Sequence, residues 1–497
     1  MRLDLFLIKT SIFRMFATLT HADYFSWSLL FYISEWIIRI VMLFEVPRRR
    51  APQSSMAWLL VIFFEPWIGL FFYWLIGSHR LPRQRIKEHD EILQRLENVH
   101  QRLDVHPNIA QPQLGPRAME AVKLAERLGY MPILDGNSVE LIDQTDVFIN
   151  KLVADIDAAQ RHVHLLFYIY ANDSTGRRVA DSLYRAVARG VKCRVLADGV
   201  GSRPFFKRLG KEMSARGVEL HEALPVGLFR RSMARLDLRN HRKVAVIDGQ
   251  IGYTGSQNIV DAGYGHKDLA WHDLMVRLTG PIILELQAVF ISDWFFETNE
   301  ALDGEEFFPD LSPSGEIAVQ TLPSGPSYPT ENYQRMVVAA IHSAERRVTI
   351  TSPYFVPDEA FLQAMQTAIM RGVKVEVIVP RRVDQKLVGA AGRSYYDDLL
   401  YMDATLYLYD EGLLHAKTMC IDDSIAFIGS SNFDIRSFAL NFEINLLFYG
   451  PRVAEQLRAQ QQKYIEKSFQ LTAERWNQRP AIKKLFQNVA KLVSPLL

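Results

Sequence analysis

Two long apolar segments open the chain, one over residues 27–46 and one over residues 56–77. Each has the roughly 20 residues that a helix needs to cross the hydrocarbon core of a bilayer. The second segment contains 12 Leu, Ile, Val and Phe residues and one charged residue, Glu65. On insertion scales, that many apolar side chains outweigh a single carboxylate. We therefore expect the second segment to insert into a membrane on its own.

The first segment carries two charges, Glu35 and Arg39, which make its insertion less favourable. Because they stand four residues apart on a helix, they face the same side and can form an ion pair. The second segment is one short loop away, so the pattern predicts a transmembrane helical hairpin within a membrane anchor over residues 1–80. A buried or interfacial helix is the alternative for the first segment, and residues 1–20 are expected to lie along the membrane surface.

The positive charges around the hairpin predict its orientation. Three of them, Arg48, Arg49 and Arg50, lie in the connecting loop, whereas seven flank the hairpin: Arg2, Lys9, Arg14, Arg80, Arg83, Arg85 and Lys87. Cationic residues accumulate on the cytoplasmic side of membrane proteins. We therefore expect a multi-pass protein of the cell (inner) membrane, with both termini and the bulk of the chain facing the cytoplasm.

Beyond a polar linker over residues 81–130, short β-rich runs alternate with helical patterns. Examples are residues 162–170, 191–198, 347–355 and 373–380. Strands that alternate with helices predict a layered α/β fold.

The same order of elements occurs twice. The tetrapeptide RGVK precedes a strand at both 189–192 and 371–374, and residues 241–258 match residues 415–432. Residues 272–281 likewise match residues 442–451, and a Pro/Ser/Gly-rich stretch over 311–329 marks the boundary between the copies. The sequence therefore predicts two duplicated mixed-sheet α/β domains, over residues 131–310 and 311–497, in a pseudo-twofold arrangement.

Composition narrows the class of protein. Among 497 residues the net charge is +1, which argues against a nucleic-acid binder held mainly by phosphate contacts. The two cysteines are too few for a disulfide scaffold or a thiolate zinc site. With 48% hydrophobic and 23% charged residues, the chain has the composition of a globular protein.

Each copy contains the pattern H-x-K-x4-D followed by G-S-x-N. The catalytic candidates are His241, Lys243, Asp248, His415, Lys417 and Asp422, and the substrate-binding candidates are Ser256, Asn258, Ser430 and Asn432. Two such motifs at equal offsets inside a wider repeat do not arise by chance. We expect both aspartates to be structural, and the two serines either to contact a phosphate or to stabilise turns.

In a strand, a histidine and a lysine two residues apart project to the same face. Two facing copies would therefore place two imidazoles, two ammonium groups and two amides around one anion, as a phosphodiester requires. One imidazole can attack as a nucleophile while the other acts as a general acid. Asp273 and Glu443, at matching places after each motif, are candidates for orienting the imidazoles. Such a site needs no metal ion.

The paired motifs over residues 130–460 resemble the phospholipase D superfamily. The N-terminal segments, Pro66–Gly69, TSPYFVPD (351–358) and the closing VSPLL narrow the resemblance to bacterial cardiolipin synthases. This resemblance implies a phosphatidyltransferase without a cofactor that makes cardiolipin and glycerol from two phosphatidylglycerol molecules. It also implies that His241 is the nucleophile, forming a phosphatidyl-histidine intermediate, and that His415 acts first as acid and then as base.

One departure concerns the carboxylates. Asp273 follows its histidine by 32 residues, whereas the longer Glu443 follows by 28, so the orienting role of Asp273 is the less secure. Other reactions stay open: a hydrolytic phospholipase D, a transphosphatidylase with another donor or acceptor such as phosphatidylethanolamine, a nuclease, or an inactive membrane scaffold.

Two cationic regions are ambiguous. Residues 229–243 carry six cations and one anion just before His241, and Arg381, Arg382 and Lys386 follow the matching strand in copy two. They are expected either to capture an anionic lipid headgroup or to form a solvated face. The segment from residue 455 onward, rich in Gln, Lys and Arg, is expected to rest on the membrane or to pack on the domain.

Overall fold

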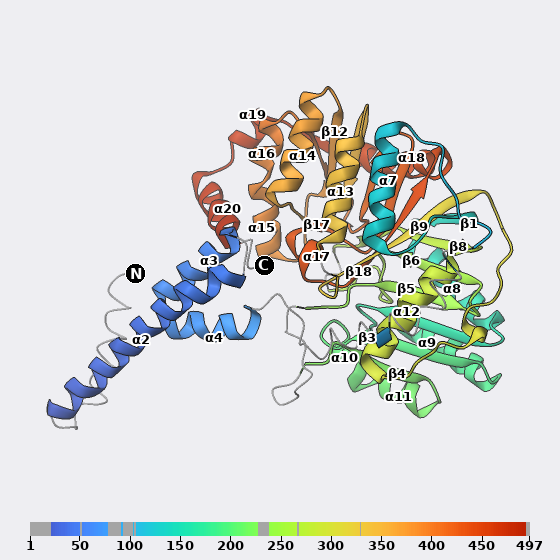
Figure 1. Ribbon diagram of the computed structural model, residues 1–497, viewed down its shortest axis with the longest axis horizontal. Coiled ribbons are helices and arrows are strands. Elements are labelled where there is room, and N and C mark those ends of the chain that lie inside the picture. Colours follow the sequence, from blue (N-terminus) through green and yellow to red (C-terminus); the bar gives the residue numbers. More distant parts are fainter. Residues whose placement is uncertain are drawn as a thin grey trace. The chain divides into compact units, whose positions relative to one another are not determined.

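The computed structural model describes residues 21–49, 52–77, 91–92, 103, 106–226, 238–265, 268–328 and 330–493 (Figure 1). The chain divides into two compact units, Met1–His79 and Arg80–Pro495. The surface helix expected over residues 1–20, residues 229–237 of the basic segment, and the final four residues lie outside the described residues.

The described residues of the N-terminal unit form three helices, α2 (His21–Arg49), α3 (Pro52–Phe64) and α4 (Pro66–Ile76). They share a small core that includes Ile38 and Met42 from α2 and Trp58 and Ile62 from α3. The ion pair that the sequence predicts is confirmed, with Arg39 Nη1 3.3 Å from the Glu35 carboxylate.

The expectation of one continuous helix over residues 56–77 is wrong. The chain breaks at Glu65 because Pro66 has no N–H to donate and its ring clashes with the preceding turn, although it suits the first position of a new helix. After the break, α4 folds back so closely that a Cβ on Gly69 would lie 2.6 Å from Cα of Ile62. Among the described residues, no single helix combines the length and the apolar character needed to cross a membrane.

The second unit contains both copies of the repeat, joined in one sheet of 15 strands. Their order is β19-β13-β12-β10-β15-β16-β18-β9-β1-β8-β6-β5-β2-β3-β4. The strands of copy one are β1 (Leu134–Ile142), β2 (His162–Phe167), β3 (Lys192–Asp198), β4 (Glu219–Ala223), β5 (Lys243–Ile247), β6 (Ile251–Gly255) and β8 (Met275–Thr279). Those of copy two are β9 (Ile317–Ser324), β10 (Arg347–Thr351), β12 (Lys374–Pro380), β13 (Thr405–Tyr409), β15 (Thr418–Ile421), β16 (Ile425–Gly429) and β18 (Glu443–Tyr449), with β19 (Ser468–Leu471) at the edge.

Apart from the edge strand β19, this order reads the same from either side of the β1–β9 pair, as a pseudo-twofold axis between antiparallel strands requires. In copy one, β2 pairs in parallel with β3 and antiparallel with β5; in copy two, β10 pairs in the same way with β12 and β15. The duplicated α/β mixed sheet predicted from the repeats is therefore confirmed.

Helices cover both faces of the sheet. Copy one contains α8 (Thr145–Ala158), α9 (Ser174–Ala188), α10 (Arg203–Lys207), α11 (Leu209–Ala215), α12 (Ile283–Thr298) and the 3-10 turn η1 (Glu305–Phe307). Copy two contains α13 (Asn332–Ser343), α14 (Glu359–Met370), α15 (Lys386–Ser394), α16 (Tyr396–Tyr401), α17 (Ile435–Ala439), α18 (Pro451–Glu466), α19 (Ala473–Asn477) and α20 (Ala481–Val493). One of the apolar cores contains residues from strands of both copies, together with residues of α12 and α18.

Helix α7 (Pro116–Gly129) shows that the predicted linker is partly structured. Its residues Ala121, Val122 and Ala125 are buried in the core of copy two, together with residues of α13. The segment between the anchor and copy one therefore adds an outer helix to copy two, on the side where Figure 1 shows α7 beside α13.

Candidate active site

The two histidine motifs meet because the sheet curls. Four strands separate β6 from β16 in the sheet order, yet their backbones come within 8 Å of each other. Short cross-copy pairings then complete the junction. The β14 strand (Leu413–Leu414), just before His415, pairs with β7 (Trp271–His272) of copy one, and the His241 backbone N–H donates to the carbonyl of Phe442 at 2.9 Å.

As a result, each histidine receives the carboxylate of the opposite copy. His415 Nδ1 lies 2.6 Å from Asp273 Oδ1, and His241 Nδ1 lies 3.4 Å from Glu443 Oε1. The sequence predicted that these carboxylates orient imidazoles but not that the pairing crosses between the copies. Asp273, the shorter of the two carboxylate side chains, therefore makes the shorter of the two contacts with an imidazole.

The serines of the G-S-x-N motifs form hydrogen bonds with the two carboxylates. Ser256 Oγ donates to Asp273 and Ser430 Oγ donates to Glu443, each at 2.6 Å, and both serine oxygens also accept a backbone N–H. Each carboxylate is therefore fixed from one side by a hydroxyl and faces an imidazole on the other. A neutral imidazole that donates from Nδ1 to a carboxylate keeps its lone pair on Nε2.

Burial decides which side chains of this site are charged. Desolvation lowers the pKa of His415 to about 4, with Lys417 and Lys243 adding to the effect and Asp273 opposing it. It also lowers the pKa of His241, against the raising influence of Glu443. Burial by itself would raise the pKa of Asp273, but the contact with His415 holds it at about 2. At neutral pH the site therefore contains neutral imidazoles next to ionised carboxylates.

Each motif lysine is buried and donates to the backbone carbonyl of the histidine two residues before it. Lys243 Nζ donates to the carbonyl of His241 at 2.6 Å, and Lys417 Nζ donates to that of His415 at 2.5 Å. Burial lowers the pKa of Lys243 to about 8 and that of Lys417 to about 7. An anion that enters the site would stabilise the charged form of both lysines and of the imidazoles.

The asparagines differ between the copies. Asn258 Oδ1 accepts the backbone N–H of Ile169 at 3.0 Å, which leaves its amide N–H groups to donate elsewhere. Asn432 Oδ1 is buried without a hydrogen-bond partner in the described part of the chain. The structure thus places all four residues of the predicted substrate-binding set at the ends of β6 and β16, where Ser256 and Ser430 serve the carboxylates.

The motif aspartates lie at the far end of β5 and β15 from the histidines. Asp248 accepts the backbone N–H groups of residues 160, 161 and 162 at 2.8 to 2.9 Å. Asp422 accepts those of residues 345, 346 and 347 at 2.8 to 3.0 Å. Both residues have a positive φ, near 50°. Asp248 therefore closes the turn that leads into β2, and Asp422 closes the turn that leads into β10.

Two aromatic rings that the sequence analysis missed cover the histidines. Tyr168 lies 4.0 Å, centroid to centroid, from His241, and Trp271 lies 4.4 Å from His415. Both rings come from copy one, so the site is less symmetric than the motifs. Trp271 stands two residues before Asp273, so in an extended segment both side chains lie on the same face. This spacing could have predicted that Trp271 lies in the site.

The basic segment before His241 contributes less surface charge than its sequence suggests. Arg239 is buried against Asp198, and Arg242 is buried with Nη1 2.5 Å from Asp293. The expectation that these two arginines capture a headgroup or form a solvated face is wrong, because their charges are neutralised inside the fold. Arg381 likewise pairs with Asp410 at 2.7 Å.

A duplicated α/β fold with two H-x-K-x4-D clusters in one site defines a phospholipase D-like protein. The family model described as "Cardiolipin synthase, PLD-like domain" matches residues 152–294 and 337–465, and one described as "Phospholipase_D-nuclease N-terminal" matches residues 37–78. The chain belongs to the cardiolipin synthase family of phospholipase D-like proteins.

Relatives and solved structures agree with this assignment. Cardiolipin synthase A of Proteus mirabilis (strain HI4320) is 34% identical over 95% of this chain and 98% of its own length. Cardiolipin synthase A of Pectobacterium carotovorum subsp. carotovorum (strain PC1) is 35% identical over the same shares. The crystal structure of phosphatidylserine synthase from Haemophilus influenzae Rd KW20 shares the fold, with a TM-score of 0.58 at 16% identity over 76% of this chain and 100% of that one.

Proposed function

We propose that this chain transfers a phosphatidyl group from one phosphatidylglycerol to another, giving cardiolipin and glycerol. The observation that carries the proposal is the crosswise pairing of His241 with Glu443 and of His415 with Asp273 around two buried lysines. Two imidazoles with fixed Nδ1 atoms and free lone pairs suit two successive displacements at one phosphorus. Membership in a family whose relatives are named cardiolipin synthase supports the choice of substrate.

In the first displacement, Nε2 of His241 attacks phosphorus while protonated His415 donates its proton to the departing glycerol oxygen. A P–N bond forms and the P–O bond to glycerol breaks. Lys243 and Lys417 stabilise the negative charge on the phosphoryl oxygens. Because the phosphodiester anion opposes the desolvation that lowers the pKa of His415, binding of the substrate raises that pKa and His415 takes up a proton from solvent.

In the second displacement, a hydroxyl of another phosphatidylglycerol attacks the phosphatidyl-histidine. Its proton passes to the now neutral His415, the new P–O bond forms, and the P–N bond to His241 breaks. His415 is then protonated and His241 is free and neutral, as both were before the first displacement. If water took the place of the hydroxyl, the same steps would give phosphatidic acid, which is the hydrolytic alternative.

The decisive experiment compares the wild-type protein with His241→Ala in detergent micelles of phosphatidylglycerol, following lipids and glycerol by mass spectrometry. His342→Ala, on the exposed side of α13, is the matched control. We expect cardiolipin and equimolar glycerol from the wild type and the control, and neither from His241→Ala. Donor lipid labelled at phosphorus should label the wild-type protein through an acid-labile, base-stable bond. Phosphatidic acid as the only lipid product would replace the transferase with a hydrolase.

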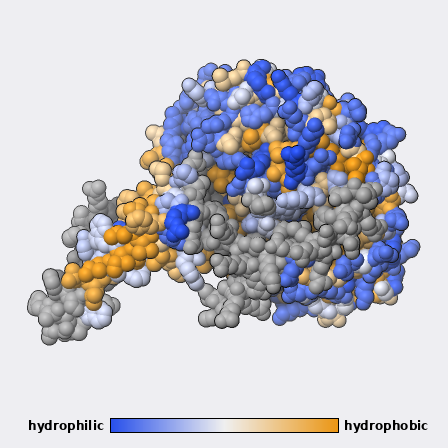
Figure 2. Space-filling view, in the orientation of Figure 1, coloured by the Kyte–Doolittle hydropathy of each residue, from blue (hydrophilic) through white to orange (hydrophobic). Residues whose placement is uncertain are grey.

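Membrane attachment is part of the proposal. Large apolar side chains such as Leu30, Phe44, Phe64 and Trp74 are exposed on the N-terminal unit. Figure 2 shows apolar surface over the helices of this unit. Exposed apolar surface of this extent marks an interaction site. The bias of seven flanking cations against three supports a multi-pass anchor in the inner membrane with the catalytic unit in the cytoplasm. A C-terminal reporter that fluoresces only in the cytoplasm tests this topology.

The catalytic unit has an apolar stripe of its own on α20. Five side chains, Ile482, Leu485, Phe486, Val489 and Leu492, are between 51% and 71% exposed, and they recur at the spacing of one helical face. The opposite face packs on α15, with Ala490 buried. The contact with α15 supports the expectation that the C-terminal segment packs on the domain. The apolar stripe supports the alternative that the segment rests on the membrane, since Lys483 and Lys484 border the stripe and suit an anionic surface.

A further inference from the structure

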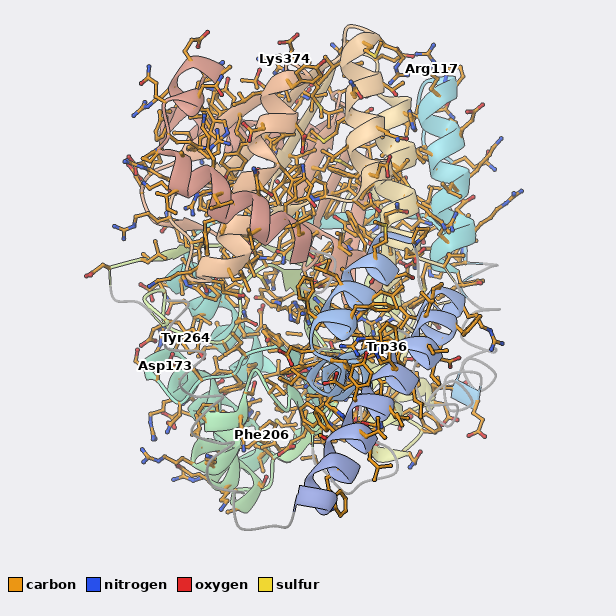
Figure 3. All side chains as sticks on the ribbon, turned by 90° about the vertical axis from the view of Figure 1, so that its left-hand side faces the viewer. Trp36, Arg117, Asp173, Phe206, Tyr264 and Lys374 are labelled. Atoms are coloured by element: carbon orange, nitrogen blue, oxygen red, sulfur yellow. The ribbon has the colours of Figure 1, made fainter. Side chains whose placement is uncertain are left out.

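A large cavity lies in copy one, outside the cluster of histidines and lysines. It has a volume of about 620 Å³ and is lined by residues that follow β2 and β3, together with Tyr264. Figure 3 shows two of its lining residues, Asp173 and Tyr264, next to each other on this copy. A cavity of this size accommodates a small polar molecule or a lipid headgroup.

The charge of this cavity is positive. Arg203, Lys207 and Arg208 line it and are exposed, and none of them forms an ion pair within the described residues. The single carboxylate in the wall, Asp173, is already engaged by the backbone N–H groups of Gly176 and Asp261 at 2.9 and 2.8 Å. Three cations that have no carboxylate partner among the described residues favour an anionic ligand.

A second feature of the wall points to a hydroxyl on that ligand. Asn172 lines the cavity, and its side-chain oxygen is buried without a hydrogen-bond partner in the described residues. An unpaired buried acceptor is costly unless a ligand or water donates to it. Cations and a free acceptor together match a phosphate ester that carries hydroxyl groups.

The cavity is one side chain away from each catalytic histidine. Gly201 in its wall lies so close to Tyr168 that a Cβ would be 2.8 Å from the ring, and that ring also contacts His241. Tyr264 in the wall contacts Trp271, with ring centroids 6.0 Å apart, and Trp271 contacts His415. A ligand held here would therefore lie beside the reacting phosphorus.

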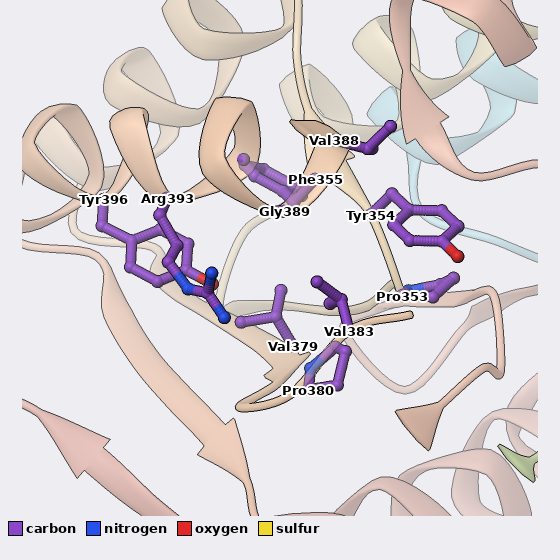
Figure 4. Close-up of a pocket in the computed structure, with 11 residues that line it drawn as sticks. Pro353, Tyr354, Phe355, Val379, Pro380, Val383, Val388, Gly389, Arg393 and Tyr396 are labelled. Carbon is purple, nitrogen blue, oxygen red and sulfur yellow. The ribbon is translucent and has the colours of Figure 1, made fainter. Parts of the chain in front are cut away.

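The corresponding place in copy two is closed. The cavity that follows β10 and β12 has a volume of only about 10 Å³, room for one water molecule at most. Its wall includes Val379, Pro380, Val383 and Val388, and Figure 4 shows the first three close together. The duplicated fold therefore does not require an open basic cavity. Among the described residues, the open cavity is a feature of copy one alone, which indicates a specific function for it.

We propose that the cavity binds the headgroup phosphate of the second phospholipid, the acceptor of the phosphatidyl group. This inference rests on the proposed function and assigns the two substrates to different places. The donor phosphate occupies the histidine–lysine cluster, and the acceptor phosphate is held by Arg203, Lys207 and Arg208. Asn172 accepts one glycerol hydroxyl, and the other hydroxyl reaches the phosphatidyl-histidine, gives its proton to His415 and displaces His241.

The test uses the full-length chain with the substitutions Arg203→Gln, Lys207→Gln and Arg208→Gln combined. Lys211→Gln, an exposed cation on the neighbouring helix α11, is the matched control. Mixed micelles contain phosphatidylglycerol as donor and ethanol as a small neutral acceptor, so that cardiolipin and phosphatidylethanol form in competition. Because ethanol does not use the cationic pocket, we expect the ratio of cardiolipin to phosphatidylethanol to fall about tenfold or more in the triple variant and to stay constant in the control.

Several outcomes would overturn the assignment. An unchanged product ratio would show that the cations do not hold the acceptor. An equal loss of both products in a triple variant with the wild-type melting temperature would place the cations in the donor step. Efficient transfer to soluble glycerol 3-phosphate, lost in the triple variant, would assign the cavity to a soluble phosphate ester instead of a lipid. Absence of both products from the wild type would instead refute the proposed function.

Discussion

The contact between Asp273 and His415 gives the sharpest prediction about catalysis. At 2.6 Å it is a short hydrogen bond between a carboxylate and an imidazole that must become charged before the glycerol can leave. A hydrogen bond to a charged group contributes about 1.5–3 kcal/mol. With 1.36 kcal/mol for each factor of ten, we expect Asp273→Asn to lower kcat about 10- to 150-fold.

The same substitution should move the pH dependence in a defined direction. Three charged groups face His415: Lys417 and Lys243 lower its pKa, and Asp273 raises it. Removing the carboxylate charge therefore lowers the pKa of His415 further, by about 1–2 units on the same scale. Since His415 must be protonated for the first displacement, the pH of maximal activity should fall by about half that shift.

Initial rates of glycerol release at a series of pH values measure both effects. Glu443→Gln is the comparison, because its contact with His241 is longer, 3.4 Å, and should cost less. Activity of Asp273→Asn within threefold of the wild type would refute the orienting role. A large loss without movement of the pH maximum would show that Asp273 supports only the fold of this region.

Three further outcomes are expected. Asp422→Ala removes the acceptor of three consecutive backbone N–H groups and should lower the free energy of unfolding by about 1–3 kcal/mol in chemical denaturation, without moving the pH maximum. Leu485→Ser combined with Phe486→Ser should raise KM for phosphatidylglycerol in vesicles severalfold but leave KM for a soluble short-chain analogue unchanged. KM should rise above about pH 8, because the pKa values of about 8 for Lys243 and about 7 for Lys417 mark the loss of their charges; a flat KM across that range would contradict their role in phosphate binding.

The repeat made much of the catalytic unit predictable. Matching segments require matching folds, so the duplicated sheet and the meeting of two histidine motifs followed from the sequence. The four strand-like runs became β2, β3, β10 with the short β11 (Phe355–Val356), and β12, because alternating or continuous β-branched residues are a local signal. The Glu35–Arg39 pair was equally local, since residues four apart on a helix are neighbours.

The remaining features depend on contacts between distant segments. Spacing along one copy cannot reveal that Asp273 serves His415, 142 residues away, because the pairing crosses the pseudo-twofold axis. The burial of Arg242 depends on Asp293, on a helix that lies 51 residues further along. Pro66 was visible in the sequence as a helix breaker. A hydropathy sum over the segment counts only the apolar character of its residues, so it does not detect that proline interrupts the helix.

The crosswise pairing also determines whether the two copies could function as separate chains. Each copy supplies one histidine and the carboxylate that completes the other, so neither copy alone contains a finished catalytic pair. A chain cut in the seam between the copies would yield two inactive fragments whose activity returns only when they reassemble along the β1–β9 and β7–β14 strand pairs. Any ancestor with a single copy would have had to work as a dimer, in which one mutation in a carboxylate disabled both histidines at once. Joining the copies in one chain removed that constraint, and it allowed Asp273 and Glu443, and the cavities beside them, to become different.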